Sequence, residues 1–307
     1  MVTISDAQPE TSPDRPVIFG EVLYDCFAGG PEVLGGAPFN VAWHLQGFGQ
    51  QPLLISRVGR DAHGDALLAQ MRSWGMDTRG VQRDPEHPTG RVEIVQDGSH
   101  HSFDILPDQA YDHIDADTAC EQLLEFNVAL LYIGSLARRH PVSCRAMEAL
   151  QAQGHPAFVD INLRAPWWDE AGVRALLRQA RWFKLNDEEL RQLEPAAAAA
   201  GEIAAARALL EQNGLELLIL TRGADGALLL SRDAQLEGRP PELERLVDTV
   251  GAGDAFSAVA ILGLLRGWTL EQILERALTF AARITEQRGA TAADQALYQH
   301  YCEQWGL

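Results

Sequence analysis

Short apolar runs rich in valine, isoleucine and leucine alternate with segments of helical pattern along most of the 307-residue chain. The first run, PVIFGEVLYDCF at 16–27, is predicted to form one buried strand, and a helix is expected from about Pro38, after a glycine-rich stretch. A strand at 51–59 and a helix at 61–76 come next. This order is typical of a doubly wound α/β fold, in which helices flank a mostly parallel sheet.

The region 88–105 interrupts this alternation. Two segments that alternate polar and apolar residues flank the sequence QDGSH, in which Asp-Gly is a frequent hairpin turn. Such alternation is typical of an antiparallel sheet with one solvated face. We therefore expect a small antiparallel β lid, formed by about 22–35 and 88–105, within a single domain that spans 1–307.

The strand and helix alternation resumes after the predicted lid. The chain has no internal repeat and no linker long enough to divide it into two domains. Strands are predicted at 128–134, 156–162, 182–186, 215–223 and 226–231, and helices at 115–126, 142–153, 170–180, 196–213 and from Asp254 onward.

Charge and apolar content exclude several classes of partner. The chain carries 43 acidic and 25 basic residues, a formal net charge of −18, whereas a nucleic acid or an anionic membrane requires a basic face. No stretch approaches 18 uninterrupted apolar residues, and the first residues lack the pattern of a secretion signal, so we expect a cytoplasmic protein.

The four cysteines lie far apart, which predicts reduced thiols rather than disulfides or a cysteine-based zinc site.

Lys184 is the only lysine among the 25 basic residues. A P-loop requires a lysine within its GK[ST] motif, and that motif is absent. Any phosphate group must therefore be bound by backbone amides, a helix N-terminus, arginine or a metal ion.

The segment LVDTVGAGDAF at 246–256 has the composition of an anion-binding turn. Glycines 251 and 253 lack Cβ atoms, so the amides of 251–254 can face one concavity, where a helix starting near Asp254 adds partial positive charge. Asp254 is then placed to take a proton from a hydroxyl that attacks a phosphoryl group. The predicted catalytic residues are Gly251, Ala252, Gly253 and Asp254; the alternative is that Asp254 only caps the helix.

The sequence DTVGAGDAF resembles the second signature of the ribokinase-like (PfkB) family of carbohydrate kinases. GGAPFNVAWHLQGFG, at 35–49, resembles the N-terminal signature of the same family. The match spans roughly 17–291 and is most similar to the branch of fructokinases and 2-keto-3-deoxygluconate kinases. Other segments that match in family order are GEVLYD (20–25), RVGRDAHGDALL (57–68), DINLRAPWWD (160–169), KLNDEEL (184–190), TRGADGALL (221–229) and RGA (288–290).

This resemblance implies a ribokinase-like fold, ATP and Mg²⁺ as cofactors and, in many members, a monovalent cation such as K⁺. It implies a magnesium ligand at Glu189 and a monovalent-cation ligand at Asp248. Because Mg²⁺ retains several waters, no tight carboxylate cluster is expected. The implied sugar contacts are Asp25, Gly35, Gly36, Asn40, Arg164 and Asp254, and the implied nucleotide contacts are Asn162, Arg164, Asn186, Thr221, Gly223, Gly226, Gly251 and Gly253.

The predicted lid indicates which sugar is phosphorylated. Relatives that act on 2-keto-3-deoxygluconate usually carry an arginine in a lid strand for the carboxylate, but the segment 102–114 has none. Asp104 and Asp108 would repel an anionic substrate. The sequence therefore predicts a neutral sugar, fructose or a related ketohexose, with 2-keto-3-deoxygluconate as the alternative.

Three further hypotheses follow from the same residues. A non-catalytic sugar or nucleotide sensor of this fold stays open, although the intact Asp254 and Asn162 count against it. A dinucleotide-dependent oxidoreductase is disfavoured because no G-x-G-x-x-G follows the first strand. The edges of 88–105 favour a homodimer formed through the lid.

Overall fold

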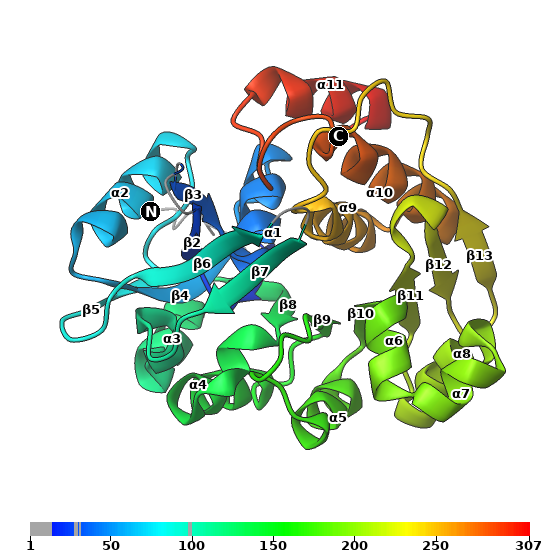
Figure 1. Cartoon of the computed structure of the whole chain (residues 1–307), viewed down its shortest axis with the longest axis horizontal. Coiled ribbons are helices and arrows are strands. Elements are labelled where there is room, and N and C mark those ends of the chain that lie inside the picture. The colour runs from blue at the N-terminus through cyan, green and yellow to red at the C-terminus, as the bar shows by residue number, and fades with distance from the viewer. Residues whose placement is uncertain (1–13, 28–29, 31, 98–99) are drawn as a thin grey trace, which may run out of the picture.

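The computed structural model of the protein describes residues 14–27, 30, 32–97 and 100–307. These residues form a sheet of nine strands in the order β13-β12-β11-β10-β9-β8-β1-β4-β5 and a sheet of four in the order β3-β2-β6-β7 (Figure 1). The strands of the large sheet are β1 Asp14–Phe19, β4 Leu53–Gly59, β5 Val81–Asp84, β8 Asn127–Gly134, β9 Ala157–Asp160, β10 Trp182–Asn186, β11 Leu217–Thr221, β12 Ala227–Leu230 and β13 Gln235–Gly238.

The large sheet is parallel from β5 to β11, and at its other edge β12 pairs antiparallel with both β11 and β13. In β1, Ile18 contributes to one hydrophobic core while Val17 and Phe19 contribute to the other. Strands buried on both faces are typical of a sheet covered by helices on each side. The predicted doubly wound α/β fold is therefore confirmed.

Two layers of helices cover the large sheet (Figure 1). The first layer packs on the face of Ile18 and consists of α1 Ala37–Gly47, α2 Ala62–Ser73, α9 Ala252–Arg266, α10 Leu270–Ile284 and α11 Gln295–Trp305. The second layer contains α3 Ala116–Gln122, α4 Pro141–Gln151, α5 Glu170–Gln179, α6 Asp187–Leu193, α7 Pro195–Ala200 and α8 Glu202–Asn213.

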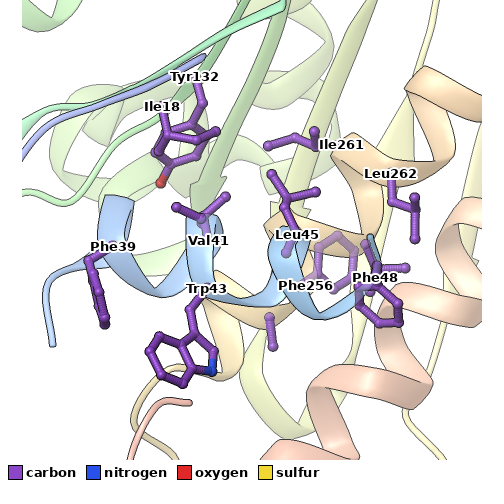
Figure 2. Close-up of a cluster of buried hydrophobic side chains, with 14 of the residues drawn as sticks. Ile18, Phe39, Val41, Trp43, Leu45, Phe48, Tyr132, Phe256, Ile261 and Leu262 are labelled. Carbon is purple, nitrogen blue, oxygen red and sulfur yellow. The ribbon is translucent and has the colours of Figure 1, made fainter. Parts of the chain in front are cut away.

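Helix α1 lies between the large sheet and the helices of its own layer. Its side chains Val41 and Leu45 contact the core that includes Ile18 and Tyr132 of the sheet and Phe256 of α9 (Figure 2). Every residue from Pro38 to Leu45 is buried, so the helix is enclosed on all sides, as expected where its apolar residues are not confined to one face. This packing fixes the first turn of α1 beside the first turn of α9.

The small sheet consists of β2 Leu23–Phe27, β3 Glu32–Gly35, β6 Gly90–Asp97 and β7 His100–Ile105. The pairs β2–β3 and β6–β7 are antiparallel, as expected for the small sheet, while the two hairpins join through the parallel pair β2–β6. The prediction of one strand over 16–27 is wrong, because β1 and β2 belong to different sheets. Gly20 separates them with a φ of +150°, and a Cβ there would lie 2.3 Å from Pro38 Cγ.

Two other predictions need correction, and two strands are added. The helix predicted over 196–213 is two helices, α7 and α8, separated at Gly201 with a φ of +148°. Helix α9 begins at Ala252, two residues before the predicted start. The short strands β5 and β13 were not predicted. Among the described residues, every helix is too short or too polar to cross a lipid bilayer.

Candidate active site

A cleft of about 370 Å³ opens where five strands of the large sheet end, and residues of the small sheet line its other wall. Glu21 follows β1, and β8 to β11 contribute Gly134, Asp160, Asn186 and Thr221. This is the edge at which ligands of doubly wound sheets bind. The structure brings eleven of the predicted site residues to this cleft: Asp25, Gly36, Asn40, Asn162, Arg164, Asn186, Glu189, Thr221, Gly251, Gly253 and Asp254.

Two of the predicted nucleotide contacts, Gly223 and Gly226, are not among the residues that line the cleft. They lie in the turn between β11 and β12 with φ values of +55° and +95°. A Cβ on Gly226 would lie 1.9 Å from the carbonyl oxygen of Gly238, so the pairing of β12 with β13 requires glycine there. A separate hollow of about 540 Å³ adjoins this turn, and Arg222 forms ion pairs within it.

The N-terminus of α9 reaches the cleft. Its N-cap residue, Gly251, has a φ of +81°, and a Cβ there would lie 2.4 Å from the Cα of Ala290. No side chain of the described residues caps this helix. The first intrahelical bond runs from the Ala255 amide to the Gly251 carbonyl at 2.9 Å, so the amides before it lie at the positive end of the helix dipole without an intrahelical partner. The arrangement is therefore suited to bind an anion, as the sequence predicts.

Asp254 is the third residue of α9, so it does not occupy the capping position that the alternative hypothesis gave it. Its Oδ2 instead accepts a hydrogen bond of 2.7 Å from Asn40 Nδ2. Burial raises the pKa of Asp254 to about 7, and the charge of Asp160 adds to this effect, while the bond from Asn40 opposes it. A carboxylate with a pKa near neutrality can accept and release a proton at physiological pH.

Lys184 and Asp160 form a buried ion pair beside the first turn of α9, and sequence reasoning gave neither residue a role. The Nζ atom of Lys184 donates to both oxygens of Asp160, at 2.8 and 3.0 Å, and Ser257 Oγ donates to Oδ2 at 2.6 Å. Asp160 holds the pKa of Lys184 above its ordinary value despite burial. A Cβ on Gly253 would lie 3.6 Å from Nζ, so the ammonium group lies next to the predicted anion hole.

Glu189 connects two of the segments that line the cleft. One of its oxygens accepts the amide of Asn186 at 2.8 Å, and the other accepts the amide of Leu163 at 3.1 Å. The side chain of Asn186 accepts the amide of Glu189 in return, which completes a capping box at the start of α6. Burial raises the pKa of Glu189. The geometry gives Glu189 a positioning role, and its role as a magnesium ligand stays a prediction.

The small sheet contributes Asp25 to the cleft. Burial raises the pKa of Asp25 to about 6, the charge of Asp248 raises it further, and Arg164 lowers it. A Cβ on Gly35 would lie 2.9 Å from Asp25 Oδ2, and one on Gly36 would lie 2.8 Å from a backbone oxygen. The predicted glycine pair therefore provides the space in which Asp25 faces the cleft.

Glu21 is a further buried acid of the cleft, and the sequence motifs indicated no role for it. It is 2% exposed, and its Oε2 has no hydrogen-bond partner among the described residues. Burial raises the pKa of Glu21 to about 7, with a further contribution from the charge of Asp254. With Asp25, Asp160, Glu189 and Asp254, Glu21 gives the cleft a concentration of carboxylates that the sequence analysis did not expect.

Asp104 and Asp108 do not line the cleft, contrary to the sequence-based argument about the substrate. Asp104 is exposed on β7, and Asp108 forms a hydrogen bond with His113 on another part of the surface. The lid residues that do line the cleft are Leu23, Asp25, Val92 and Ile105. The argument that Asp104 and Asp108 repel an anionic substrate is therefore wrong.

A sequence model of the pfkB family carbohydrate kinases matches residues 30–296. This chain belongs to that family. The match confirms the family, the ribokinase-like fold and the enzyme class, a carbohydrate kinase, that the signatures predict.

Named relatives of this kinase include several fructokinases. A fructokinase of Escherichia coli is 31% identical over 242 residues, which cover 75% of this chain and 76% of the relative. Fructokinase-2 of Oryza sativa is 26% identical over 94% of this chain and 93% of its own. The solved structure of a fructokinase from Vibrio cholerae with fructose, ADP and calcium ion has a TM-score of 0.79 at 24% identity, covering 94% of this chain and 98% of that one.

Proposed function

We propose that this kinase transfers the γ-phosphoryl group of ATP to a hydroxyl of a neutral sugar, most simply fructose or a related ketohexose, with Asp254 as the general base. The observation that carries the proposal is the position of Asp254 in the first turn of α9, inside the cleft and bonded to Asn40. Phosphoryl transfer depends on in-line placement and on stabilisation of the developing charge. The cleft offers a base and an anion hole within one helical turn.

The residues on the acceptor side bind and deprotonate the sugar in this proposal. Asp254 accepts the proton of the attacking hydroxyl, and Asn40 holds its carboxylate in place. Asn40 Oδ1 is buried without a partner in the described part of the chain, so it is open to a sugar hydroxyl. Asp25 offers a further acceptor from the lid, in the space that Gly35 and Gly36 leave.

The residues on the donor side fit a nucleotide triphosphate. Gly251, Gly253 and Asp254 at the N-terminus of α9 line the cleft with Lys184 and Arg164, while the amide of the predicted Ala252 donates to the Thr249 carbonyl at 3.4 Å. ATP supplies the phosphoryl group when bound, and these donors stabilise the charge that develops on its oxygens. Asn162, Asn186 and Thr221 line the nucleotide side of the proposed site. The related fructokinase of V. cholerae was solved with ADP, which supports an adenine nucleotide as the phosphoryl donor.

Two cation ligands remain part of the proposal. Glu189 would hold Mg²⁺, since each of its oxygens accepts one backbone amide and retains a further lone pair. Asp248 would lie beside a monovalent cation such as K⁺. Its carboxylate accepts the amides of Val250 at 3.0 Å and Gly289 at 3.1 Å, and so connects the segment before α9 to the RGA stretch.

The charge of the cleft supports a neutral substrate. Five carboxylates line it, against the two cations Lys184 and Arg164, and Lys184 is already paired with Asp160. Carboxyl groups accept hydrogen bonds from sugar hydroxyls, and those that are ionised repel an acid. The alternatives are 2-keto-3-deoxygluconate, for which Arg164 would have to bind the substrate carboxylate, and a sensor that binds sugar or nucleotide without turnover.

A substrate screen tests this proposal. Purified protein with ATP and Mg²⁺ is offered a panel of neutral sugars beside 2-keto-3-deoxygluconate, and ADP release is measured. We expect the highest kcat/KM for fructose or another neutral ketohexose. Preference for the acid would overturn the choice of substrate and leave the kinase chemistry standing. Nucleotide binding without ADP release for any sugar would favour the sensor.

We also propose a homodimer that forms through the small sheet. Strands β3 and β7 are its edges, and an edge strand presents unpaired backbone groups that a second copy can pair with. Sedimentation that gives a single monomeric species would contradict this proposal.

A further inference from the structure

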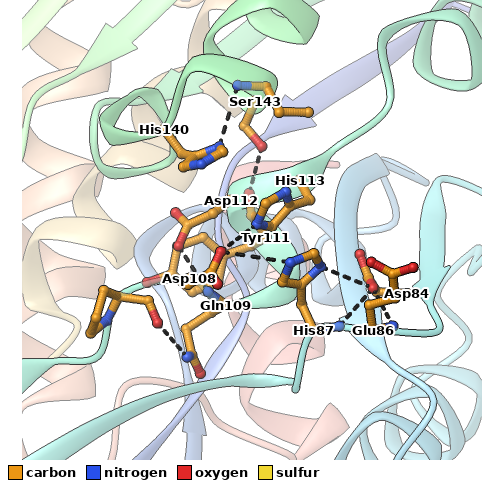
Figure 3. Close-up of polar contacts among 12 residues, drawn as sticks. Asp84, Glu86, His87, Asp108, Gln109, Tyr111, Asp112, His113, His140 and Ser143 are labelled. Carbon is orange, nitrogen blue, oxygen red and sulfur yellow. Dashed lines mark hydrogen bonds and ion pairs between the residues drawn. The ribbon is translucent and has the colours of Figure 1, made fainter.

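A second group of polar side chains, drawn in Figure 3, lies at the base of the small sheet. His87 precedes β6, Asp108 follows β7, and His113 ends the short helix η1, Ala110–His113. Asp84 is the last residue of β5. As far as the structure describes the chain, none of these residues lines the cleft of Asp254.

The two imidazoles converge on one carboxylate oxygen. His113 Nε2 lies 2.7 Å from Asp108 Oδ1, and His87 Nε2 lies 3.6 Å from the same atom. The rings of His87 and His113 stack with centroids 3.6 Å apart and an interplanar angle of 12°. One ligand atom from each of the three residues lies within 4.8 Å of the others. Figure 3 shows the three side chains turned toward one another.

Asp84 determines which nitrogen of His87 is protonated. Asp84 is 1% exposed, and its Oδ1 lies 3.1 Å from His87 Nδ1, while Arg57 pairs with its Oδ2 at 2.6 Å. The amides of Glu86 and His87 also donate to Oδ1, each at 2.8 Å. An ionised carboxylate with these donors requires a proton on Nδ1. With Nδ1 bonded to Asp84, Nε2 is the ring nitrogen of His87 that faces Asp108.

The charges around the three side chains also favour a cation. His87 and His113 line a hollow that carries more acidic than basic groups. The adjoining hollow of about 290 Å³ is lined by the acids Asp84, Glu86 and Asp115 as well as by Arg57. A divalent cation bound to the three side chains would offset this excess of negative charge.

We propose that His87, Asp108 and His113 bind a divalent transition-metal ion, best matched by Zn²⁺, with water completing the coordination. Two imidazoles and a carboxylate form a common zinc donor set, and tetrahedral ligands at about 2.05 Å from zinc lie about 3.3 Å apart. The separations of 2.7 and 3.6 Å lie on either side of that value. The Asp84–His87 contact is the carboxylate–histidine pair that orients zinc ligands in proteins.

His140 is a neighbour of this site and not one of its ligands. Its ring lies 4.5 Å from that of His113. The Nδ1 atom of His140 accepts the amide of Val142 at the start of α4, so its proton resides on Nε2.

A bound ion would cross-link three segments at the base of the lid. His87 leads into β6, Asp108 follows β7, and His113 belongs to η1, which packs against the large sheet through β4 and β5. We therefore expect the ion to stabilise the small sheet against the body of the protein, and to raise Tm more than it changes turnover.

Metal titration of the chelator-treated full chain tests the proposal. Zn²⁺ affinity is measured by competition with a chromogenic chelator, and Co²⁺ absorption in the visible range reports four-coordinate geometry. We expect one equivalent to bind the wild type, and binding at least about tenfold weaker in His87→Ala, His113→Ala and Asp108→Asn. His300→Ala, on an exposed position of α11, and His155→Ala serve as matched controls that keep wild-type affinity.

Two readouts separate loss of the site from loss of the fold. The variants should keep the wild-type far-UV circular dichroism, and Zn²⁺ should raise the Tm of the wild type but not that of His113→Ala. The conservative His113→Gln is used if His113→Ala does not fold. The proposal is overturned if the wild type binds no ion, or if the three site variants bind it as tightly as the two controls.

Discussion

Asn40 Nδ2 donates a 2.7 Å hydrogen bond to Asp254 Oδ2, joining the first turns of two helices whose residues are 214 positions apart in sequence. The bond stabilises the ionised form of a carboxylate whose pKa burial raises to about 7. It also fixes the orientation of the proposed base relative to the amides of 251–254. The pair therefore controls both the position of Asp254 and the pH at which it can accept a proton.

Replacing Asn40 by alanine should shift the pH dependence of kcat/KM. Asp254 must be ionised to act as a base, so activity falls as pH decreases through its pKa. Loss of a hydrogen bond to a charged group, about 1.5–3 kcal/mol, corresponds to an upward shift of about one to two pH units in that acid limb. Gln46→Ala, on the same helix but outside the cleft, should leave the limb in place. An unshifted limb in Asn40→Ala would contradict the proposed role of Asn40.

Replacing Glu21 by glutamine should stabilise the protein at alkaline pH. The folded state raises the pKa of Glu21 from 4.5 to about 7, so it binds this proton more tightly than the unfolded state does. Stability is therefore lost as pH rises from about 4.5 to about 7, and the penalty persists above that range. Glutamine is neutral at every pH, so Tm of Glu21→Gln should exceed that of the wild type at pH 8 but not at pH 4.5. Calorimetry at the two pH values decides this, and equal gains at both would contradict it.

Variants of the Lys184–Asp160 pair separate the contribution of Lys184 to stability from its contribution to catalysis. Lys184→Met leaves Asp160 buried without its partner, which should cost about 3–5 kcal/mol of stability. The double variant Lys184→Met/Asp160→Asn removes both charges and should recover most of that loss. If Lys184 stabilises the transferred phosphoryl group, kcat should remain about 10²–10³-fold reduced in the double variant. Recovery of activity together with stability would assign the lysine a structural role alone.

The two glycines of the anion hole should respond differently to alanine. Gly251 has a positive φ, and its Cβ would meet the backbone of Ala290, so Gly251→Ala should lose roughly 1–3 kcal/mol or more of stability. Gly253 lies within α9, and its Cβ would make an ordinary 3.6 Å contact with Lys184 Nζ. Gly253→Ala should therefore fold normally while its methyl group crowds the phosphate site and raises KM for ATP. Urea denaturation and steady-state kinetics measure the two effects.

The family signatures predicted those site residues whose role depends on the conformation of the backbone around them. Gly251 and Asp254 are recognisable because a glycine turn that enters a helix is a local feature, and the structure places both in the cleft. Parallel strands and their helices were predictable for the same reason, since periodicity is local. The break at Gly20 was missed because it arises from contact with Pro38, which belongs to another element.

Features that depend on distant parts of the chain were not predictable in this way. Glu21, Asp160 and Lys184 meet only because β1, β9 and β10 end at one edge of the sheet, and no spacing in the sequence shows this. The presence of a single lysine was the one available signal, and it was used only to exclude a P-loop. The sequence position of Asp108 placed it near the substrate, but in the structure Asp108 lies at the base of the lid, where it bonds to His113.

The rate of phosphoryl transfer by Asp254→Asn tests the central claim most directly. Asparagine preserves the shape of the side chain and cannot accept the proton, so the variant should bind ATP with wild-type affinity and lose about 10²–10⁴-fold in kcat with the preferred sugar. Wild-type ATP affinity with such a loss of kcat is the result that this account predicts. Turnover by Asp254→Asn within a fewfold of the wild type would show that another group takes the proton and would contradict the account.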